Sequence, residues 1–249
     1  MFTQIGLVGY GVFGRLLADK LKHYCSLKVY DKQPISISES NLQTASIDEV
    51  LAQPVIILAI PVQAQESFWQ AHANKVNLKS LVMDVSSVKL IPIRWMRQYL
   101  PPSTQIVGLH PLFGPHTVAK VGGWSGLTIV SCPVRVKKET YSQLKDFLET
   151  KLELTVTELN PKAHDQRMAW VQALTFFIGK GIANLNIQAS SLDTLTYKYL
   201  LNIKEVVTSD TEDLFYTIQK YNPYARAIRK KFLQTLKQLD QQIVKFKPE

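Results

Sequence analysis

A glycine motif near the start of the chain has the spacing that binds the phosphates of a dinucleotide. The segment LVGYGVFG, residues 7–14, follows an apolar run and carries Gly9, Gly11 and Gly14. The first glycine allows a tight turn, the second lets the backbone approach a pyrophosphate, and the third lets the next helix pack closely on the strand. The positive N-terminus of that helix would face the phosphates, so we expect Val12 and Phe13 to contact the dinucleotide as well.

An acidic residue at the end of the next apolar run supports this interpretation. Asp31 ends the segment LKVYD, about 20 residues after the glycines, where a carboxylate binds the ribose of a bound dinucleotide. A carboxylate there accepts hydrogen bonds from both ribose hydroxyls and repels a 2′-phosphate, so the sequence favours NAD over NADP. Lys32 beside it weakens that preference a little. The alternative is a glycine-rich turn with no ligand.

A histidine in a rigid segment is the leading candidate for proton transfer. His110 lies in GLHPLFGP, residues 108–115, and Pro111 holds the residue before it in an extended conformation at the end of a strand. Beside a nicotinamide, such a histidine can accept the proton of a hydroxyl group whose carbon gives up a hydride. Ser87 could hydrogen-bond His110 and fix its tautomer, so we predict these two as catalytic residues. The alternative is a histidine with a structural role only.

Two further segments fall where strands are expected to end, and ligands of open α/β sheets bind at such ends. Ile60 and Pro61 follow an apolar run and could line the cofactor through their backbone. The segment DVSSVK, residues 84–89, contains Ser87 and ends at Lys89; in the alternative interpretation both residues only cap the next helix. The sequence has no P-loop, nucleophile elbow or zinc-ligand spacing, so it predicts neither hydrolase chemistry nor a metal site.

These residues require a parallel sheet to bring them together. Strands are expected near residues 4–8, 27–31, 55–60, 81–86, 105–109 and 127–132, with helical stretches between the early ones. This α/β alternation predicts a doubly wound, mainly parallel sheet of the Rossmann type. Helical spacing then dominates residues 161–186, 190–208, 211–221 and 223–246. We therefore predict a dinucleotide-binding domain over residues 1–159 and an all-helical domain over residues 160–249.

Within the helical half, residues 168–178 are apolar on nearly every side, so this helix should be buried in the domain core or against a second subunit. The net charge of +9 comes mostly from residues 220–249, which hold eight Lys or Arg residues and two acidic ones. Apolar residues recur there at spacings of three and four, which is typical of an amphipathic helix with a solvated basic face. A nucleic-acid patch is the less favoured alternative.

Composition places the chain among globular proteins. No apolar run is long enough to span a membrane, and the segment Met1–Gln4 leads straight into the first expected strand, so we expect a cytoplasmic protein. The two cysteines, Cys25 and Cys132, have neither metal-ligand nor disulfide-framework spacing.

Four segments together resemble a known family. VGYGVFG, DVSSVK, GLHPLFGP and AHDQRMAWVQAL occur in the order and spacing of the prephenate/arogenate dehydrogenases of tyrosine biosynthesis, over nearly the whole chain. The resemblance implies the NAD(P)-dependent oxidative decarboxylation of a cyclohexadienol. In it, His110 matches the histidine that accepts the hydroxyl proton, Ser87 the serine that orients it, and Lys89 the lysine at the cofactor end of its motif. The helical half matches the family's dimerisation domain, so the resemblance also implies a homodimer.

The chain departs from the family pattern at two positions. Tyr197 is followed by Lys198, where relatives that use prephenate have an arginine that binds the ring carboxylate, and Phe176 stands where some relatives have a histidine. Lysine keeps the charge but lacks the bidentate fork of arginine, so substrate affinity or choice could differ. We expect Tyr197 and Lys198 to bind the substrate. Prephenate is the leading substrate and arogenate the alternative; a nucleotide-sensing protein that has lost the reaction is a further alternative.

Overall fold

The computed structural model describes residues 2–246, except for the side chain of Ser38. The chain folds as two units, Met1–His164 and Asp165–Glu249. The boundary predicted from the sequence, between residues 159 and 160, lies close to this division.

The first unit is built on one mainly parallel sheet. Its strands are β1 (Gln4–Val8), β2 (Ser26–Tyr30), β3 (Ser38–Glu39), β4 (Leu42–Thr44), β5 (Val55–Leu58), β6 (Leu81–Asp84), β7 (Gln105–Pro111), β8 (Thr128–Arg135) and β9 (Thr155–Glu158). They lie in the order β3-β4-β2-β1-β5-β6-β7-β8-β9. Among the strands of residues 2–246, only the pairs β3–β4 and β7–β8 are antiparallel. The predicted Rossmann-type fold class is therefore confirmed.

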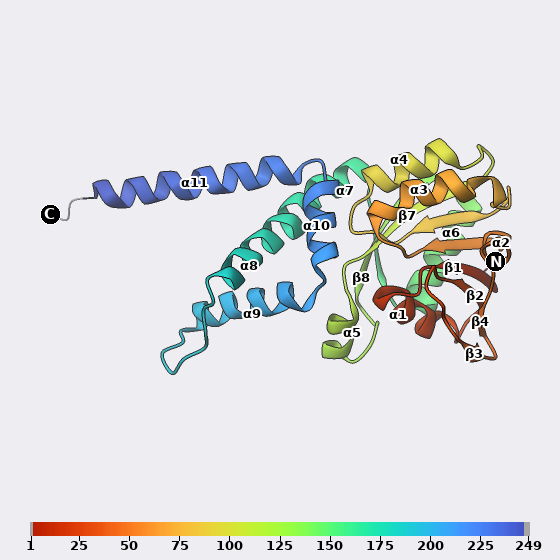
Figure 1. The fold of residues 1–249 in the computed structure, drawn as a ribbon, viewed down its shortest axis with the longest axis horizontal. Helices are drawn as coiled ribbons and strands as arrows, with labels where there is room; N and C mark the ends of the chain where they lie inside the picture. The colour runs from red at the N-terminus through yellow and green to blue at the C-terminus, as the bar shows by residue number, and fades with distance from the viewer. Residues whose placement is uncertain (1, 247–249) are drawn as a thin grey trace. The chain divides into compact units, whose positions relative to one another are not determined.

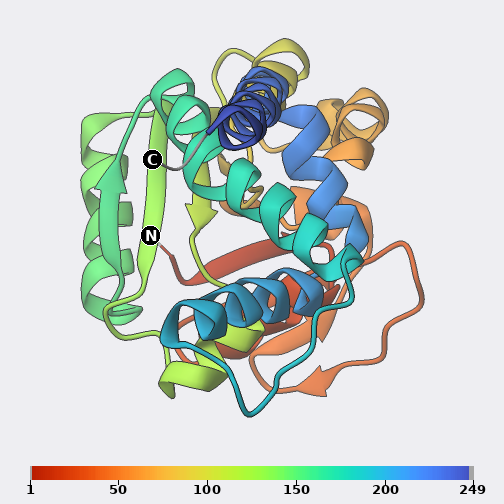
Figure 2. The same ribbon diagram turned by 90° about the vertical axis from the view of Figure 1, so that its left-hand side faces the viewer.

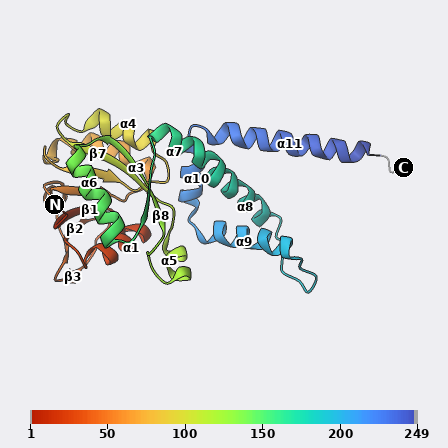
Figure 3. The ribbon, with the colours of Figure 1, turned by 180° about the vertical axis from the view of Figure 1, so that it is seen from behind.

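Helices cover both faces of this sheet. They are α1 (Val12–Leu21), α2 (Ile47–Leu51), α3 (Val62–His72), η1 (Ala73–Lys75), α4 (Leu90–Tyr99), α5 (Pro115–Val121), α6 (Lys138–Asp146) and the π-helical turn η2 (Phe147–Lys151). Figures 1 and 3 show α3 and α4 on one face and α1 and α6 on the other. On the second face Leu17, Leu21 and Leu144 pack against alternate strand residues such as Leu7 and Ile57. Burial of these apolar side chains from both faces fixes the strand ends in place.

The order of the strands reverses at β1, which creates the crevice where such sheets bind ligands. β1 pairs with β2 on one side and with β5 on the other. The last residues of β1, β5 and β6 are in register, since Val8 pairs with Leu58 and Leu58 with Asp84. Asp84 in turn pairs with Gly108 on β7. The segments predicted to carry chemistry therefore lie at or directly after the carboxyl ends of four adjacent strands, β1, β5, β6 and β7.

Three strands of the sheet had no signal in the sequence. β3 and β4 are two and three residues long, too short to show alternation. β9 reads Thr155–Glu158, and none of its four residues is fully buried, so it has no apolar run. Strands at or near the edges of a sheet need less apolar surface than central ones, and this is why they were missed.

The second unit is all-helical, as predicted. Its elements are the end of α7 (Pro161–Met168), the π-helical turn η3 (Ala169–Leu174), α8 (Thr175–Asn184), α9 (Leu195–Ser209), α10 (Glu212–Tyr221) and α11 (Ala225–Lys245). α8 and α9 lie side by side, as Figures 1 and 2 show. A Cβ atom at Gly179 would lie 2.6 Å from Cγ2 of Val207, so glycine allows this close approach.

Two expectations for this unit need correction. Residues 190–194 are not helical, because Thr194 caps α9 by accepting a hydrogen bond from the Tyr197 amide. The helical segment 168–178 is not buried on every side within the chain, since Trp170 is 48% exposed and Val171 is 64% exposed. The sequence predicted that this segment is buried in the domain core or against a second subunit. For Trp170 and Val171, burial in the domain core is wrong.

Candidate active site

The glycine loop after β1 has the shape expected of a pyrophosphate cradle. Gly9 has a φ of +99°. Its amide donates to the carbonyl of Tyr30 over 2.8 Å. A Cβ atom on Gly9 would lie 2.5 Å from the carbonyl oxygen of Ala59, and one on Gly14 would lie 2.2 Å from that of Gly9. Any side chain at either position would therefore collide with backbone.

The middle glycine of the motif differs, because it faces open space. A Cβ atom on Gly11 would meet nothing within 4 Å. Gly11 is the N-cap of α1 and supplies no side-chain hydrogen bond to the amides of the first turn. Val12, the first residue of that turn, is largely exposed. Amides without a side-chain cap beside an open position fit the phosphates of a dinucleotide.

Asp31 is joined to this loop by hydrogen bonds. Its Oδ2 atom accepts from the amide of Tyr10 at 2.6 Å, and its Oδ1 atom accepts from the amide of Gln33 at 2.9 Å. Tyr10 lies between the first two glycines, so the carboxylate sits directly at the edge of the cradle. Each oxygen keeps a further lone pair that can accept from a ribose hydroxyl.

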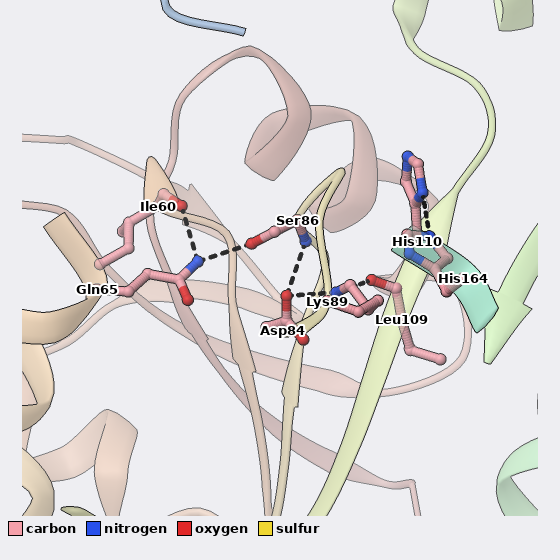
Figure 4. Close-up of polar contacts among 8 residues, drawn as sticks. All are labelled: Ile60, Gln65, Asp84, Ser86, Lys89, Leu109, His110 and His164. Atoms are coloured by element: carbon pink, nitrogen blue, oxygen red, sulfur yellow. Dashed lines mark hydrogen bonds and ion pairs between the residues drawn. The ribbon is translucent and has the colours of Figure 1, made fainter. Parts of the chain in front are cut away.

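His110 lies at the end of β7 and contacts a histidine from a distant part of the chain. Its Nδ1 atom is 2.8 Å from Nε2 of His164, which lies on α7 (Figure 4). Both rings are buried, with His110 2% exposed and His164 0% exposed. Burial lowers the pKa of His110 well below its usual value, and the neighbouring His164 and Lys89 lower it further. The imidazole is therefore neutral, which is the form that accepts a proton.

The partner expected for His110 from the sequence was wrong. Ser87 lies in the loop after β6, is half-buried, and makes no hydrogen bond to His110 among the contacts of residues 2–246. His164 occupies the Nδ1 side of the ring instead. The sequence did not predict His164 as the partner, because nothing local indicates a contact that spans 54 residues.

A hydrogen-bonded network joins the ends of neighbouring strands (Figure 4), and its members Gln65, Asp84 and Lys89 are fully buried. On α3, Gln65 Nε2 donates to the carbonyl of Ile60 at 3.4 Å and to Oγ of Ser86 at 2.7 Å. The Ser86 amide donates to Oδ2 of Asp84 at 3.0 Å. Lys89 Nζ donates to the same Oδ2 atom and, at 2.6 Å, to the carbonyl of Leu109. These hydrogen bonds thus link the loop after β5 to Leu109, the residue that precedes His110.

These contacts correct the role expected for Lys89. Its side chain is 0% exposed and forms an ion pair with the equally buried Asp84. A buried ammonium group that already binds a carboxylate and a carbonyl has no surface with which to contact a cofactor. Gly108 makes this arrangement possible, since a Cβ atom there would lie 3.0 Å from Cδ of Lys89. The geometry gives Lys89 the role of fixing the end of β7.

The other two residues expected to line the cofactor site lie where the sequence placed them. Ile60 and Pro61 follow β5 and precede α3, with Pro61 at its N-cap. Ile60 is half-buried and Pro61 is exposed. Because β5 borders β1, this turn lies beside the glycine loop, as the contact of Gly9 with Ala59 shows.

The predicted substrate-binding pair lies in the second unit, on the first turn of α9. The Tyr197 hydroxyl donates to the carbonyl of Gln188 at 2.9 Å, so this tyrosine helps to hold the loop before α9. Lys198 is exposed. Its ammonium group is therefore available to an anion.

The predicted amphipathic helix at the end of the chain is α11. Its apolar residues Leu233, Leu236, Leu239, Ile243 and Val244 are all exposed in the single chain. These side chains give α11 an exposed apolar face. No helix within residues 2–246 combines the length and the apolar character needed to cross a membrane.

Comparisons with known proteins give the family. A family model described as "Prephenate dehydrogenase, nucleotide-binding domain" matches residues 17–156, more than half of the chain. A second, described as "TYRAAT1-like, C-terminal domain", matches residues 182–247.

Two similar curated proteins are from Arabidopsis thaliana. Arogenate dehydrogenase 1, chloroplastic, is 28% identical over 233 residues, which are 89% of this chain and 36% of that protein. Arogenate dehydrogenase 2, chloroplastic, is 27% identical over 258 residues, 99% of this chain and 69% of that protein. A probable arogenate/prephenate dehydrogenase of Methanocaldococcus jannaschii is 25% identical, and the match covers 86% of this chain and 47% of that protein.

Solved structures agree on the fold. Prephenate dehydrogenase from A. aeolicus, solved with hydroxyphenyl propionate and NAD+, has a TM-score of 0.76 at 18% identity and covers 98% of this chain and 91% of that chain. Synechocystis arogenate dehydrogenase has a TM-score of 0.67 at 22% identity, and the match covers 97% of this chain and 91% of that chain. The glycine cradle, Asp31 and His110 lie at strand ends of one sheet, and the family model matches residues 17–156, so the chain belongs to the prephenate/arogenate dehydrogenase family.

Proposed function

We propose that the chain catalyses the NAD-dependent oxidative decarboxylation of prephenate to 4-hydroxyphenylpyruvate. The observation that carries this proposal is the buried, neutral imidazole of His110. It lies at the carboxyl end of β7, in the same sheet whose strand β1 leads into the glycine cradle. A histidine that acts as a general base must be neutral and within reach of the hydroxyl it deprotonates.

The cofactor part of the proposal depends on the first unit. The amides after Gly11 bind the pyrophosphate, and the Asp31 carboxylate accepts hydrogen bonds from the ribose hydroxyls. The turn at Ile60 and Pro61 lines the site. When bound, NAD supplies the acceptor for the hydride that leaves the substrate. The carboxylate at position 31 disfavours a 2′-phosphate, and for this reason NAD is preferred over NADP.

The chemical step assigns one proton to His110. Nε2 accepts the proton of the substrate hydroxyl as its ring carbon gives up a hydride and becomes a carbonyl carbon. The ring then loses CO2, and the electron pair of the broken C–C bond completes the aromatic ring. This converts the carbonyl oxygen into a phenolate oxygen, and His110 returns its proton to that oxygen, so the product is the neutral phenol. Ser87, in the neighbouring loop, is proposed to hydrogen-bond the substrate hydroxyl and keep it directed at the imidazole.

Substrate binding is assigned to Lys198 with Tyr197. The exposed ammonium of Lys198 provides a point charge for a carboxylate, without the two parallel hydrogen bonds of a guanidinium. Tyr197 is proposed to shape the same turn of α9. The helical unit is proposed to form a homodimer through its exposed apolar faces.

Arogenate is the second candidate substrate. It carries an amino group where prephenate has the ketone of its side chain, and the chemistry at the ring is the same. The two Arabidopsis relatives bear the name arogenate dehydrogenase, which favours this candidate. Lys198, in place of the arginine expected for prephenate, is compatible with either substrate.

Steady-state formation of reduced cofactor from each substrate with each cofactor tests the proposal. We expect the largest kcat/KM with prephenate and NAD. A larger value with arogenate would transfer the assignment to the second candidate, and a larger value with NADP would refute the role of Asp31. Absence of reduced cofactor in all four combinations, from protein that still binds NAD, would contradict a catalytic function.

A further inference from the structure

Two buried histidine rings meet at the end of β7. Nδ1 of His110 lies 2.8 Å from Nε2 of His164, and the ring planes are inclined by 67°. At that distance one nitrogen carries the hydrogen and the other offers its lone pair. The contact therefore has two possible forms, which differ in the tautomer of His110.

Only one of these forms leaves His110 able to act as a base. Its second nitrogen, Nε2, points away from His164 in Figure 4 and makes no hydrogen bond within residues 2–246. If Nδ1 donates to His164, Nε2 keeps a lone pair and can accept a proton. In the opposite form, Nε2 carries the hydrogen and cannot. A base of this kind usually has a third group that fixes its tautomer.

We propose that His164 is a positioning residue that accepts the Nδ1 hydrogen of His110 and so keeps Nε2 unprotonated and directed at the substrate. This inference rests on the proposed function, because it assumes that Nε2 of His110 is the base. His164 touches neither substrate nor cofactor in it. It also holds the His110 ring when the proton arrives, since an Nδ1–H donor bonded to His164 stabilises the imidazolium that forms.

The start of α7 is built to hold His164 in this place. Asn160 Oδ1 accepts from the amide of Ala163 at 2.8 Å, and the carbonyl of Asn160 accepts from the amide of His164 at 2.9 Å. One residue later, the carbonyl of Asp165 accepts from Nδ2 of Asn222 at 2.8 Å. The helix start is thus fixed on both sides of His164, and its fully buried ring has little freedom to turn.

Two substitutions separate positioning from simple packing. His164→Gln keeps an acceptor oxygen near the position of Nε2, whereas His164→Leu fills similar space without an acceptor. We expect kcat to fall by roughly 10–100-fold in His164→Leu, less than the loss of a complete general base, with KM unchanged. His164→Gln should recover most of the rate. His72→Gln is the matched control for loss of a histidine, because His72 lies on α3 and contacts Phe68 instead.

The direct test is the tautomer of His110, observed by ¹⁵N NMR of protein with labelled histidines and assigned with His110→Asn. The proposal expects Nδ1–H in the wild type and in His164→Gln, and a shift toward Nε2–H in His164→Leu. A wild-type Nε2–H tautomer would overturn it even if the leucine variant does not fold. So would an unchanged tautomer in His164→Leu. The spectrum needs no turnover, so it tests the tautomer independently of the proposed function. The proposed function is tested separately, because full activity of His110→Asn would refute it.

Discussion

Burial determines the acid–base behaviour of His110. Its ring is 2% exposed and lies near two other nitrogen-bearing side chains, so a positive charge on it is poorly solvated. At neutral pH the native imidazole is therefore uncharged and ready to accept a proton. Most histidines with an ordinary pKa would be partly protonated just below neutrality.

The pH dependence of activity should reveal this shift. Because the pKa of His110 is lowered well below 6.5, activity should persist at pH values under 6.5 and fall only when the pH passes the lower pKa. Protonation removes the base, so kcat/KM declines toward acid. A pH profile of kcat/KM with prephenate measures the pH at which activity is lost. A midpoint at or above pH 6.5 on the acid side would contradict the assignment.

Asp31 should decide between the two nicotinamide cofactors. Asp31→Ser removes the charge that repels a 2′-phosphate, so NAD binding should weaken and the preference for NAD should narrow. The carboxylate also accepts from the amides of Tyr10 and Gln33, so the loop itself could loosen. Asp31→Asn is the control, because it keeps one acceptor oxygen but no charge. Titration of both variants with NAD and NADP measures the effect, and an unchanged NAD:NADP affinity ratio in both would refute it.

At the scale of elements, one buried ion pair joins the ends of β6 and β7. Asp84 and Lys89 are both 0% exposed, and Lys89 also binds the carbonyl of Leu109. Removing one member of such a pair leaves a charge buried without its counter-ion. The pair therefore fixes the strand that carries His110.

Lys89→Met should destabilise the first unit by about 3–5 kcal/mol, the usual cost of breaking a buried ion pair from one side. The free energy of unfolding in urea measures this loss. Lys79→Met is the matched control, because Lys79 is exposed just before the same strand β6 and should change stability little. A loss of under ~1 kcal/mol in Lys89→Met would be typical of a surface ion pair and would contradict this role.

The elements that carry an obvious local pattern could be predicted from the sequence. Apolar runs identified the central strands β1, β2, β5, β6 and β7, and the spacing of glycines identified the turn before α1. β3, β4 and β9 were missed because they are short or lack buried residues. The contact of His110 with His164 and the burial of Lys89 could not be predicted, because each depends on how distant segments meet in space.

At the scale of the whole molecule, the helical unit exposes more apolar surface than a single chain normally does. Trp170 and Val171 on η3 are at least 45% exposed, and so are five apolar residues of α11: Leu233, Leu236, Leu239, Ile243 and Val244. The sequence had left two ways to cover the segment 168–178, and the side chains of Trp170 and Val171 are not covered within the chain. A second copy of the chain is the proposed cover.

The protein should therefore be a dimer in solution. Leu236→Glu and Leu239→Glu place charges on the apolar side of α11 and should shift the mass measured by light scattering toward the monomer. Gln241→Glu adds the same charge at an exposed polar position of α11 and should leave the mass unchanged. A stable wild-type monomer at micromolar concentration would contradict the proposed dimer.

The central claim is that His110 removes a proton while the chain oxidises and decarboxylates prephenate. The most direct measurement follows NADH and CO2 together, for the wild type and His110→Asn, under saturating prephenate and NAD. We predict equal amounts of NADH and CO2 from the wild type, and a kcat lower by roughly 10²–10⁴-fold in His110→Asn with NAD affinity unchanged. Near wild-type turnover by His110→Asn, or NADH formed without CO2, would contradict the account.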